Sequence, residues 1–572
     1  MTHSTTRRGF LRKTAAAGGC LLMQGMGAAA PSAQSTEPQA ATRVARGAEL
    51  LDRSPGAAPR APLVVVTQPV STDVNPRAAT WGYLTEILQR AGLFFEQRSP
   101  DDLPALLRRS KPVVLLPGNV SLTTAQRQCL ADWVRRGGAL IGIGGTSGLD
   151  EVFGVSAVDR PLAEGWIKVT ARDHAITAGL RSALHVFGGY VVKAGTATSL
   201  AEIEANDRLP KGSAILENRF GRGVAVLLAA DLIFSIVHIQ QGLPVFQDGK
   251  PAADGSARVD DGILKAEDGL VLDWQRDRQW MAADYVPIFL EPISDELREI
   301  ILRSIFHVAS RLGINLPLLW YWPRGLKAIG TLSHDTDGNL PKLAEALLEV
   351  VNRCNVKSTW CTLYPGGYPG EFYRKLQEQG FEIGLHYDAK SGAPQTSWSK
   401  DNFFLQQRWL MKEAGLRHIT TNKNHYTRWE GRLDFFRWCE EAGIESDQTR
   451  GPSKHGTIGF PLGGSQPYFP LDDERHGSRF LRVLEVNLQT QDLVVTLPGR
   501  LWQTARGFRV AASWRRALPL PSRPHPRAGS GGRDVRSGGL RPGTGIRMVD
   551  QRTDQPLGIA PSQRPRNVRL RR

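Results

Sequence analysis

The stretch that decides the fold is Ala328-Ile329-Gly330-Thr331-Leu332-Ser333-His334-Asp335-Thr336-Asp337-Gly338. Its apolar run, 328–333, ends in polar side chains, which is typical of a buried strand followed by a loop. The pattern recurs, and further strands are predicted over 356–363, 381–386, 418–425 and 444–447. Helices are predicted between them over 340–354, 370–379, 398–414 and 433–442. Parallel strands alternating with helices predict a (β/α) barrel, in which chemistry lies at the carboxyl ends of the strands.

Acidic and histidine side chains fall at those ends. The first predicted strand ends in Asp335 and Asp337, the third in His386, and the fourth in His425. One Asp and two His at a common rim form a three-ligand site with an open position for water, as a catalytic zinc requires. A second Asp can then accept a proton as general base. Such a site is suited to amide hydrolysis, with zinc as the expected divalent metal.

Two of these segments resemble motifs of a known family. Residues 332–338 are similar to the first motif of the NodB-like polysaccharide deacetylases, and residues 382–386 are similar to the second. The resemblance covers 326–500, about a third of the chain. It implies that Asp335 is the base and that Asp337 and His386 bind metal.

The chain departs from the family pattern at one ligand. The family's second His lies four residues after the first, and this chain has Lys390 there. His425 is expected to take its place because of its position at a strand end. An Asp-x-Asp-Gly string alone is more often a turn or a calcium loop, and a lone His is more often structural. Both motifs in family order at strand ends favour the deacetylase interpretation.

Neighbouring side chains complete the expected site. His334 and Asp388 are expected to orient the ligands through hydrogen bonds. Trp360, Tyr387 and Tyr426 are expected to contact a carbohydrate polymer as substrate.

An α/β pattern also precedes the barrel. Short apolar runs over 62–66, 112–116, 139–143 and 223–231, with helices over 80–91 and 121–136, predict an open parallel sheet in residues 62–240. This pattern resembles the flavodoxin-like, class-I glutamine-amidotransferase-like fold. The turn Gly144–Gly148 lacks the family's nucleophilic cysteine, and Ser147 has no recognisable base, so an accessory domain is expected. Residues 241–325 are a connecting region with an amphipathic helix over 294–312.

The amino terminus predicts export. Arg7-Arg8 is followed by a small and apolar stretch from Ala15 to Ala30, which resembles a twin-arginine signal over residues 1–33. Residues 34–61 form a linker, and the mature protein is expected in the periplasm or outside the cell. A basic arm on a cytosolic protein is the alternative interpretation.

Export can be tested directly. A fusion of residues 1–40 to a reporter is expected to lose export when Arg7 and Arg8 are both replaced by Lys. Unchanged export of that double variant would contradict the signal assignment.

The basic charge of the chain belongs to its tail. The net charge is +16, yet residues 504–572 alone carry sixteen arginines against three aspartates. Basicity confined to one end does not indicate a specific nucleic-acid binder. The composition of 504–572 is typical of a shifted reading frame or of a disordered basic tail that binds acidic polymer. Because it lacks apolar strands, the barrel of 326–503 is expected to be incomplete at its carboxyl end.

Three functions stay open at this point. The first is an exported metal-dependent polysaccharide deacetylase, impaired by the atypical carboxyl end. The second is a non-catalytic carbohydrate-binding pseudoenzyme, and the third an interaction protein. No stretch outside the signal reaches the roughly 18 apolar residues of a membrane span, and the sequence leaves the oligomeric state undetermined.

Overall fold

A computed structural model describes most of the chain between residues 61 and 491. The described ranges are 61–67, 81–109, 111–180, 183–258, 261–280, 287–326, 328–390, 394–474, 479–491, 547–549 and 556–558. The chain divides into two units, Met1–Pro55 and Gly56–Arg572. The predicted signal segment lies outside the described residues, and so does nearly all of the predicted linker and tail.

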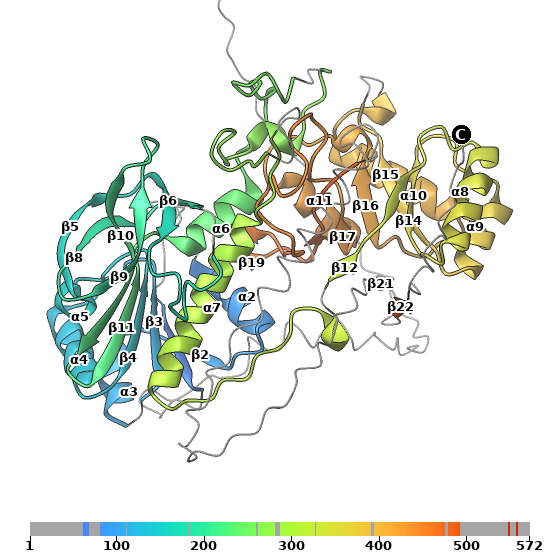
Figure 1. The fold of residues 1–572 in the computed structure, drawn as a ribbon. Coiled ribbons are helices and arrows are strands. Elements are labelled where there is room, and N and C mark those ends of the chain that lie inside the picture. Colours follow the sequence, from blue (N-terminus) through green and yellow to red (C-terminus); the bar gives the residue numbers. More distant parts are fainter. Residues whose placement is uncertain are drawn as a thin grey trace, which may run out of the picture. The chain divides into compact units, whose positions relative to one another are not determined.

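The first sheet has eleven strands and mixed direction (Figure 1). Five neighbouring strands run parallel: β2 (Phe95–Arg98), β1 (Leu63–Val66), β3 (Val113–Pro117), β4 (Ala139–Ile143) and β11 (Gly223–Leu228). The others are antiparallel: β5 (Val155–Pro161), β6 (Glu164–Val169), β7 (Leu184–Phe187), β8 (Tyr190–Ala194), β9 (Thr198–Glu204) and β10 (Pro210–Phe220). The α/β class is therefore confirmed, but a purely parallel sheet is wrong for this region.

Helices cover both faces of the parallel strands because successive side chains point in opposite directions. Leu63 and Val65 pack with α2 (Tyr83–Arg90), α6 (Leu232–Gln241) and α7 (Ile293–Arg311). Val64 and Val66 pack with α3 (Leu103–Arg109), α4 (Thr124–Arg135) and α5 (Asp150–Phe153). Every residue of β1 is buried, as its continuous apolar sequence predicts.

Helix α7 corresponds to the helix predicted over 294–312. Instead of bridging two domains, it lies in the core of the first sheet, with Ile301 and Ile305 fully buried. Residues beyond the predicted accessory domain 62–240 thus complete the hydrophobic core of that sheet.

A cluster of one histidine and two carboxylates links the segment that contains Asp277 to the first sheet. His185 on β7 contacts Asp277 through Nδ1 at 2.6 Å and Glu164 through Nε2 at 2.9 Å. Trp166 stacks on the imidazole and donates its indole N–H to Asp277. Burial alone would lower the pKa of His185, but the hydrogen bonds that the ring donates to the two carboxylates raise it above its ordinary value.

The second sheet has six strands, and every neighbouring pair is parallel. In sheet order they are β13 (Ser333–Asp335), β14 (Thr359–Leu363), β15 (Glu382–Tyr387), β16 (Thr421–Asn424), β17 (Ser446–Asp447) and β20 (Leu484–Glu485). Within the described residues the sheet runs from β13 to β20 and forms a half-barrel.

The helices of this half-barrel lie close to their predicted positions. They are α8 (Pro341–Arg353), α9 (Gly370–Glu378), α10 (Lys400–Glu413) and α11 (Asp434–Ala442). Their apolar faces form one core with β14 and β15, including Leu348, Leu376, Leu410 and Phe435.

Shorter strands lie outside this sheet. β12 (Ile329–Gly330) pairs with β21 (Arg547–Val549), which pairs with β22 (Pro556–Gly558). β18 (Leu471–Asp472) and β19 (Arg479–Phe480) form a two-stranded sheet. The described part of the tail thus pairs with β12 and not with the six-stranded sheet.

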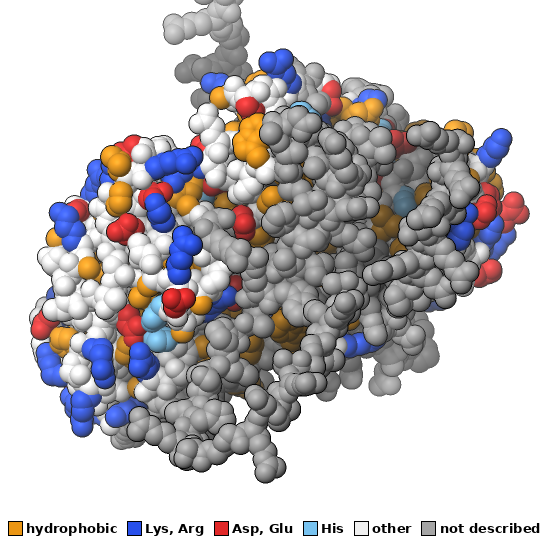
Figure 2. Space-filling model, viewed as in Figure 1, with side chains coloured by type: hydrophobic (Ala, Val, Ile, Leu, Met, Phe, Trp, Pro, Cys, Tyr) orange, Lys and Arg blue, Asp and Glu red, His pale blue; other side chains and the backbone are white. Residues whose placement is uncertain are grey.

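Two surface properties bear on partners. No described helix is both long and apolar enough to span a bilayer. Among the described residues that are visible in Figure 2, Lys and Arg side chains stand among acidic, apolar and uncharged ones and form no continuous basic stripe.

Candidate metal centre

The turn after β13 places Asp337 at the rim of the half-barrel. The predicted strand 328–333 is divided into β12 and β13, so His334 and Asp335 lie within a strand. Thr336 donates its backbone N–H and its hydroxyl to the Cys361 carbonyl of β14. Asn339 donates its amide to the Leu363 carbonyl. These contacts fix a turn in which Asp337 has a positive φ of 36° and an exposed side chain.

His386 lies on β15 with its reactive nitrogen directed toward this turn. Its Nδ1 lies 2.7 Å from the Lys423 carbonyl oxygen, so Nδ1 carries the proton and donates it. The Nε2 atom is the ring nitrogen that is left to bind a metal once it carries no proton. It is buried and has no hydrogen-bond partner. A backbone carbonyl that fixes the tautomer in this way is the usual support of a metal-binding histidine.

His425 follows β16 in the helical turn His425–Thr427. Its Nδ1 lies 3.1 Å from a carboxylate oxygen of Asp388, which orients the ring in the same way. Its Nε2 lies 3.7 Å from Asp337 Oδ1, and His386 Nε2 lies 3.5 Å from the same oxygen. The two imidazole centroids are 5.0 Å apart.

The structure thus brings Asp337, His386 and His425 together. Their ligand atoms all lie within 4.8 Å of one another. Two neutral imidazole nitrogens and one carboxylate are a donor set of catalytic zinc, and the unpartnered Nε2 of His386 is the atom that such an ion would satisfy. The residues present fit a divalent metal.

Asp388 offers a test of this geometry. Asp388→Ala is expected to weaken zinc affinity by about 10–100-fold, the usual effect of removing a carboxylate that orients a ligand histidine. Zinc titration of the purified chain against a chromophoric chelator measures it. Asp401→Ala, on the exposed first turn of α10, is the control. Equal affinities of both variants would mean that His425 is not a ligand.

Asp335 lies beside the ligands and pairs with a residue that sequence reasoning missed. Lys423 Nζ is 2.8 Å from Asp335 Oδ1, and the lysine is buried. Burial alone would raise the pKa of Asp335, but the charges of His386 and Lys423 lower it below its ordinary value. A lone Lys inside the predicted strand 418–425 was the available signal, since a buried lysine requires a partner.

The expected substrate contacts are corrected for two of three aromatic residues. Trp360 is fully buried among Phe372, Phe381 and His334, so its face cannot meet a sugar. Tyr387 is fully buried as well, and its hydroxyl donates to backbone carbonyls of 397 and 399. The sequence predicts substrate contacts for both residues, but their side chains point into the core.

Tyr426 is the aromatic residue of the three that reaches the surface. It is 41% exposed, and its ring contacts that of His425. Lys390, which occupies the position of the family's second His, donates to the Tyr426 hydroxyl at 2.9 Å. Lys390 and Tyr426 therefore flank the ligand group.

His334 does not take the orienting role expected for it. Its ring packs edge-on against Trp360, and its buried Nε2 has no partner. Burial lowers the pKa of His334 to about 4, so the ring is neutral. Among the described residues, no hydrogen bond joins His334 to a candidate ligand.

The glycine-rich turn after β4 does not form a nucleophile site. Ser147 has a positive φ of 53°, and its N–H donates to Asn119. Its hydroxyl is buried and has no hydrogen-bond partner. Without a base to accept its proton, a serine hydroxyl is a weak nucleophile at neutral pH.

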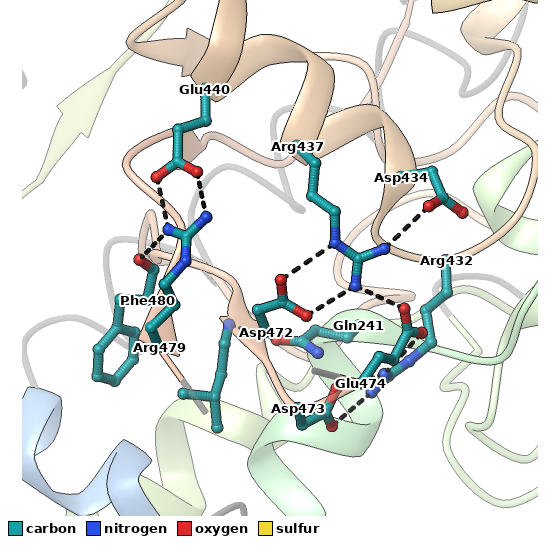
Figure 3. Close-up of polar contacts among 11 residues, drawn as sticks. Gln241, Arg432, Asp434, Arg437, Glu440, Asp472, Asp473, Glu474, Arg479 and Phe480 are labelled. Carbon is teal, nitrogen blue, oxygen red and sulfur yellow. Dashed lines mark hydrogen bonds and ion pairs between the residues drawn. The ribbon is translucent and has the colours of Figure 1, made fainter. Parts of the chain in front are cut away.

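A separate cavity of about 300 Å³ lies over α11. Its lining residues are Lys400, Asp434, Arg437, Trp438, Glu440, Glu441, Arg479 and Arg482. Arg437 donates to both oxygens of Asp472, and Arg479 to both oxygens of Glu440 (Figure 3). These charges are engaged with one another and fasten α11 to the β18–β19 hairpin, which is a structural role.

Comparisons with known proteins identify no family. No family model and no curated protein matches the chain. A cold-adapted β-galactosidase from Rahnella sp. R3 is 15% identical over 30% of this chain and 29% of its own, with a TM-score of 0.24. A β-galactosidase from Bacillus circulans sp. alkalophilus is 20% identical over 31% of this chain and 30% of its own, with a TM-score of 0.24.

A ThuA-like protein from Bacteroides uniformis ATCC 8492 is 12% identical over 33% of this chain and 96% of its own, with a TM-score of 0.23. The chain spans less than a third of the length of the two β-galactosidases. Scores and identities this low assign neither a family nor an activity.

Proposed function

We propose that the chain is a metal-dependent hydrolase that removes acetyl groups from an N-acetylated carbohydrate polymer. The observation that supports this proposal is the convergence of Asp337, His386 and His425 beside a second carboxylate, Asp335. Three ligands and one adjacent base are the minimal equipment for hydrolysing an amide with water.

Each residue has a distinct task in this proposal. Asp337, His386 and His425 would hold the metal, which when bound supplies Lewis acidity toward water and the amide carbonyl. Asp335 is ionised, because its pKa lies below its ordinary value, and accepts a proton at its carboxylate. Lys423 keeps that carboxylate charged and limits its rotation through their 2.8 Å contact.

Access to the rim supports the proposed substrate class. Asp337 has a side chain that is 66% exposed, and Tyr426 is 41% exposed, so the ligands can be reached from outside. Tyr426 presents an aromatic ring and Lys390 a donor beside them. A protruding acetamido group on a polymer suits such an open rim better than a ligand that needs full enclosure.

The remaining regions have supporting roles in this proposal. The six-stranded half-barrel would be a deacetylase-type barrel, and the first sheet an amidotransferase-like accessory domain without a nucleophile. Export by the twin-arginine route would place the enzyme in the periplasm or outside the cell.

Acetate release tests the proposal. The purified full chain, loaded with zinc, is expected to release acetate from N-acetylglucosamine oligomers, and chelation is expected to stop it. Asp337→Ala is expected to abolish both zinc binding and release. Zinc and oligomer binding without any acetate would instead indicate a carbohydrate-binding protein, and failure to bind either would leave the interaction-protein alternative.

A further inference from the structure

A second group of potential ligands lies in the first sheet. His174 follows β6, Glu217 lies on β10, and His307 lies on α7. His174 Nε2 is 2.9 Å from Glu217 Oε2, and His307 Nε2 is 3.0 Å from Glu217 Oε1. The imidazole centroids are 4.7 Å apart, and the three ligand atoms all lie within 4.8 Å of one another.

We propose that His174, Glu217 and His307 bind a second divalent metal ion of the zinc type. Two imidazole nitrogens and one carboxylate form a donor set that prefers zinc among the abundant divalent cations, whereas calcium and magnesium prefer oxygen alone. The group shares no residue with Asp337, His386 and His425, so the inference does not depend on the proposed function.

The exposure of the three side chains suits an ion that enters from solvent. The exposed fraction of the side chain is 21% for His174, 13% for Glu217 and 9% for His307. Each is shielded enough to weaken competition from water, and each remains reachable. The carboxylate holds both rings with their Nε2 atoms inward, so the ligands are preassembled.

Four existing contacts must yield to the ion, two of which are the hydrogen bonds that join His174 and His307 to Glu217. The Ile176 N–H points at His174 Nδ1 over a long 3.3 Å, and this contact is lost when Nδ1 takes the proton that Nε2 gives up. The Arg311 guanidinium lies 3.7 Å from Glu217, and its side chain is 58% exposed. It can therefore turn into solvent. The Ile176 contact is part-buried and the Arg311 contact involves a largely exposed guanidinium, and both are long, so metal–ligand bonds can replace them.

A bound ion would join three elements that are distant in sequence. It would link the loop after β6 and strand β10 to helix α7, which already packs on the sheet through Ile301 and Ile305. A three-residue site of this kind acts as a cross-link because the unfolded chain lacks it.

Zinc content of the full-length chain tests the inference. After removal of metal with a chelator, each protein is equilibrated with zinc, separated from free ion, and analysed by mass spectrometry. The wild type is expected to hold two zinc ions per chain. His386→Gln/His425→Gln is expected to keep one, and His174→Gln/His307→Gln is expected to keep the other.

The matched control is His418→Gln, because His418 is an exposed histidine paired with Glu445 at 3.3 Å without a third ligand. It is expected to hold two ions. If His386→Gln/His425→Gln holds no zinc while its circular dichroism matches the wild type, the second site is overturned. If only the first site is wrong, His174→Gln/His307→Gln is the variant without zinc, so the two failures are distinguishable.

Cobalt provides a measurement that leaves the second ligand group intact. Cobalt(II) added to His386→Gln/His425→Gln is expected to give the intense visible absorption of four-coordinate cobalt. If the variant shows no more than the weak absorption of hydrated cobalt, the inference is overturned. This measurement remains decisive even if the His174→Gln/His307→Gln chain fails to fold, because it uses the other variant.

Discussion

Asp335→Asn is expected to lower acetate release by about 10²–10⁴-fold, the usual contribution of a positioned base. The side-chain amide that replaces the carboxylate can still accept a hydrogen bond from Lys423, so strand β13 and the turn to Asp337 should persist. Zinc content should not change, because Asp337, His386 and His425 remain. This one substitution should therefore lower acetate release and leave the zinc content unchanged.

Steady-state acetate release and zinc analysis of the same preparation measure the two responses. Asp401→Asn on the exposed first turn of α10 is the control and should leave both unchanged. Loss of zinc in Asp335→Asn would mean that the roles of Asp335 and Asp337 are exchanged. Undiminished release would remove Asp335 from the mechanism.

His185→Leu is expected to destabilise the first sheet by about 3–5 kcal/mol, the range for breaking a buried ion pair on one side. Both His185 and Asp277 are completely buried. Leucine fills much the same volume, but it leaves the Asp277 carboxylate without its cationic partner. His418→Leu, at an exposed position, should cost far less.

The same substitution should also change the pH dependence of stability. The pKa of His185 is raised in the folded chain, so its contribution is fully present below about pH 6.5, the ordinary histidine value. It is lost as the pH rises through the raised pKa of the folded state. Urea midpoints of the wild type should fall over that range. An equal fall in His185→Leu would show that another group is responsible.

In the first sheet the sequence predicted the parallel strands β1, β3, β4 and β11 but missed the parallel β2 and the antiparallel strands, for a physical reason. A strand such as Leu63–Val66 is buried on both faces, so its apolar run is visible without any partner. Strands β5 and β9 carry polar residues on their exposed positions. Their pairing depends on contacts across the sheet, and the pattern within one strand does not encode it.

The proximity of Asp337, His386 and His425 was predictable because all three lie at or after the carboxyl ends of strands that meet at one rim. The pairing of Lys423 with Asp335 and the burial of Trp360 were not predictable, because both depend on which face of a strand points inward. A one-residue difference in strand register exchanges those faces. The predicted strand 328–333 is instead divided into β12 and β13, and β13 begins only at Ser333.

The position of strand β13 at the edge of the six-stranded sheet affects how the candidate site is lost on warming. It pairs with β14 alone among the described strands, and it is three residues long, whereas β15 pairs on both sides. Backbone amides at such an edge exchange with solvent deuterium through local opening that leaves the rest folded. Asp335 and Asp337 therefore lie on or directly after an edge strand, while His386 and His425 lie on or beside inner ones. On warming, local opening of β13 should disturb Asp335 and Asp337 together, so hydrolysis and tight zinc binding should be lost at the same temperature, before the rest of the half-barrel unfolds.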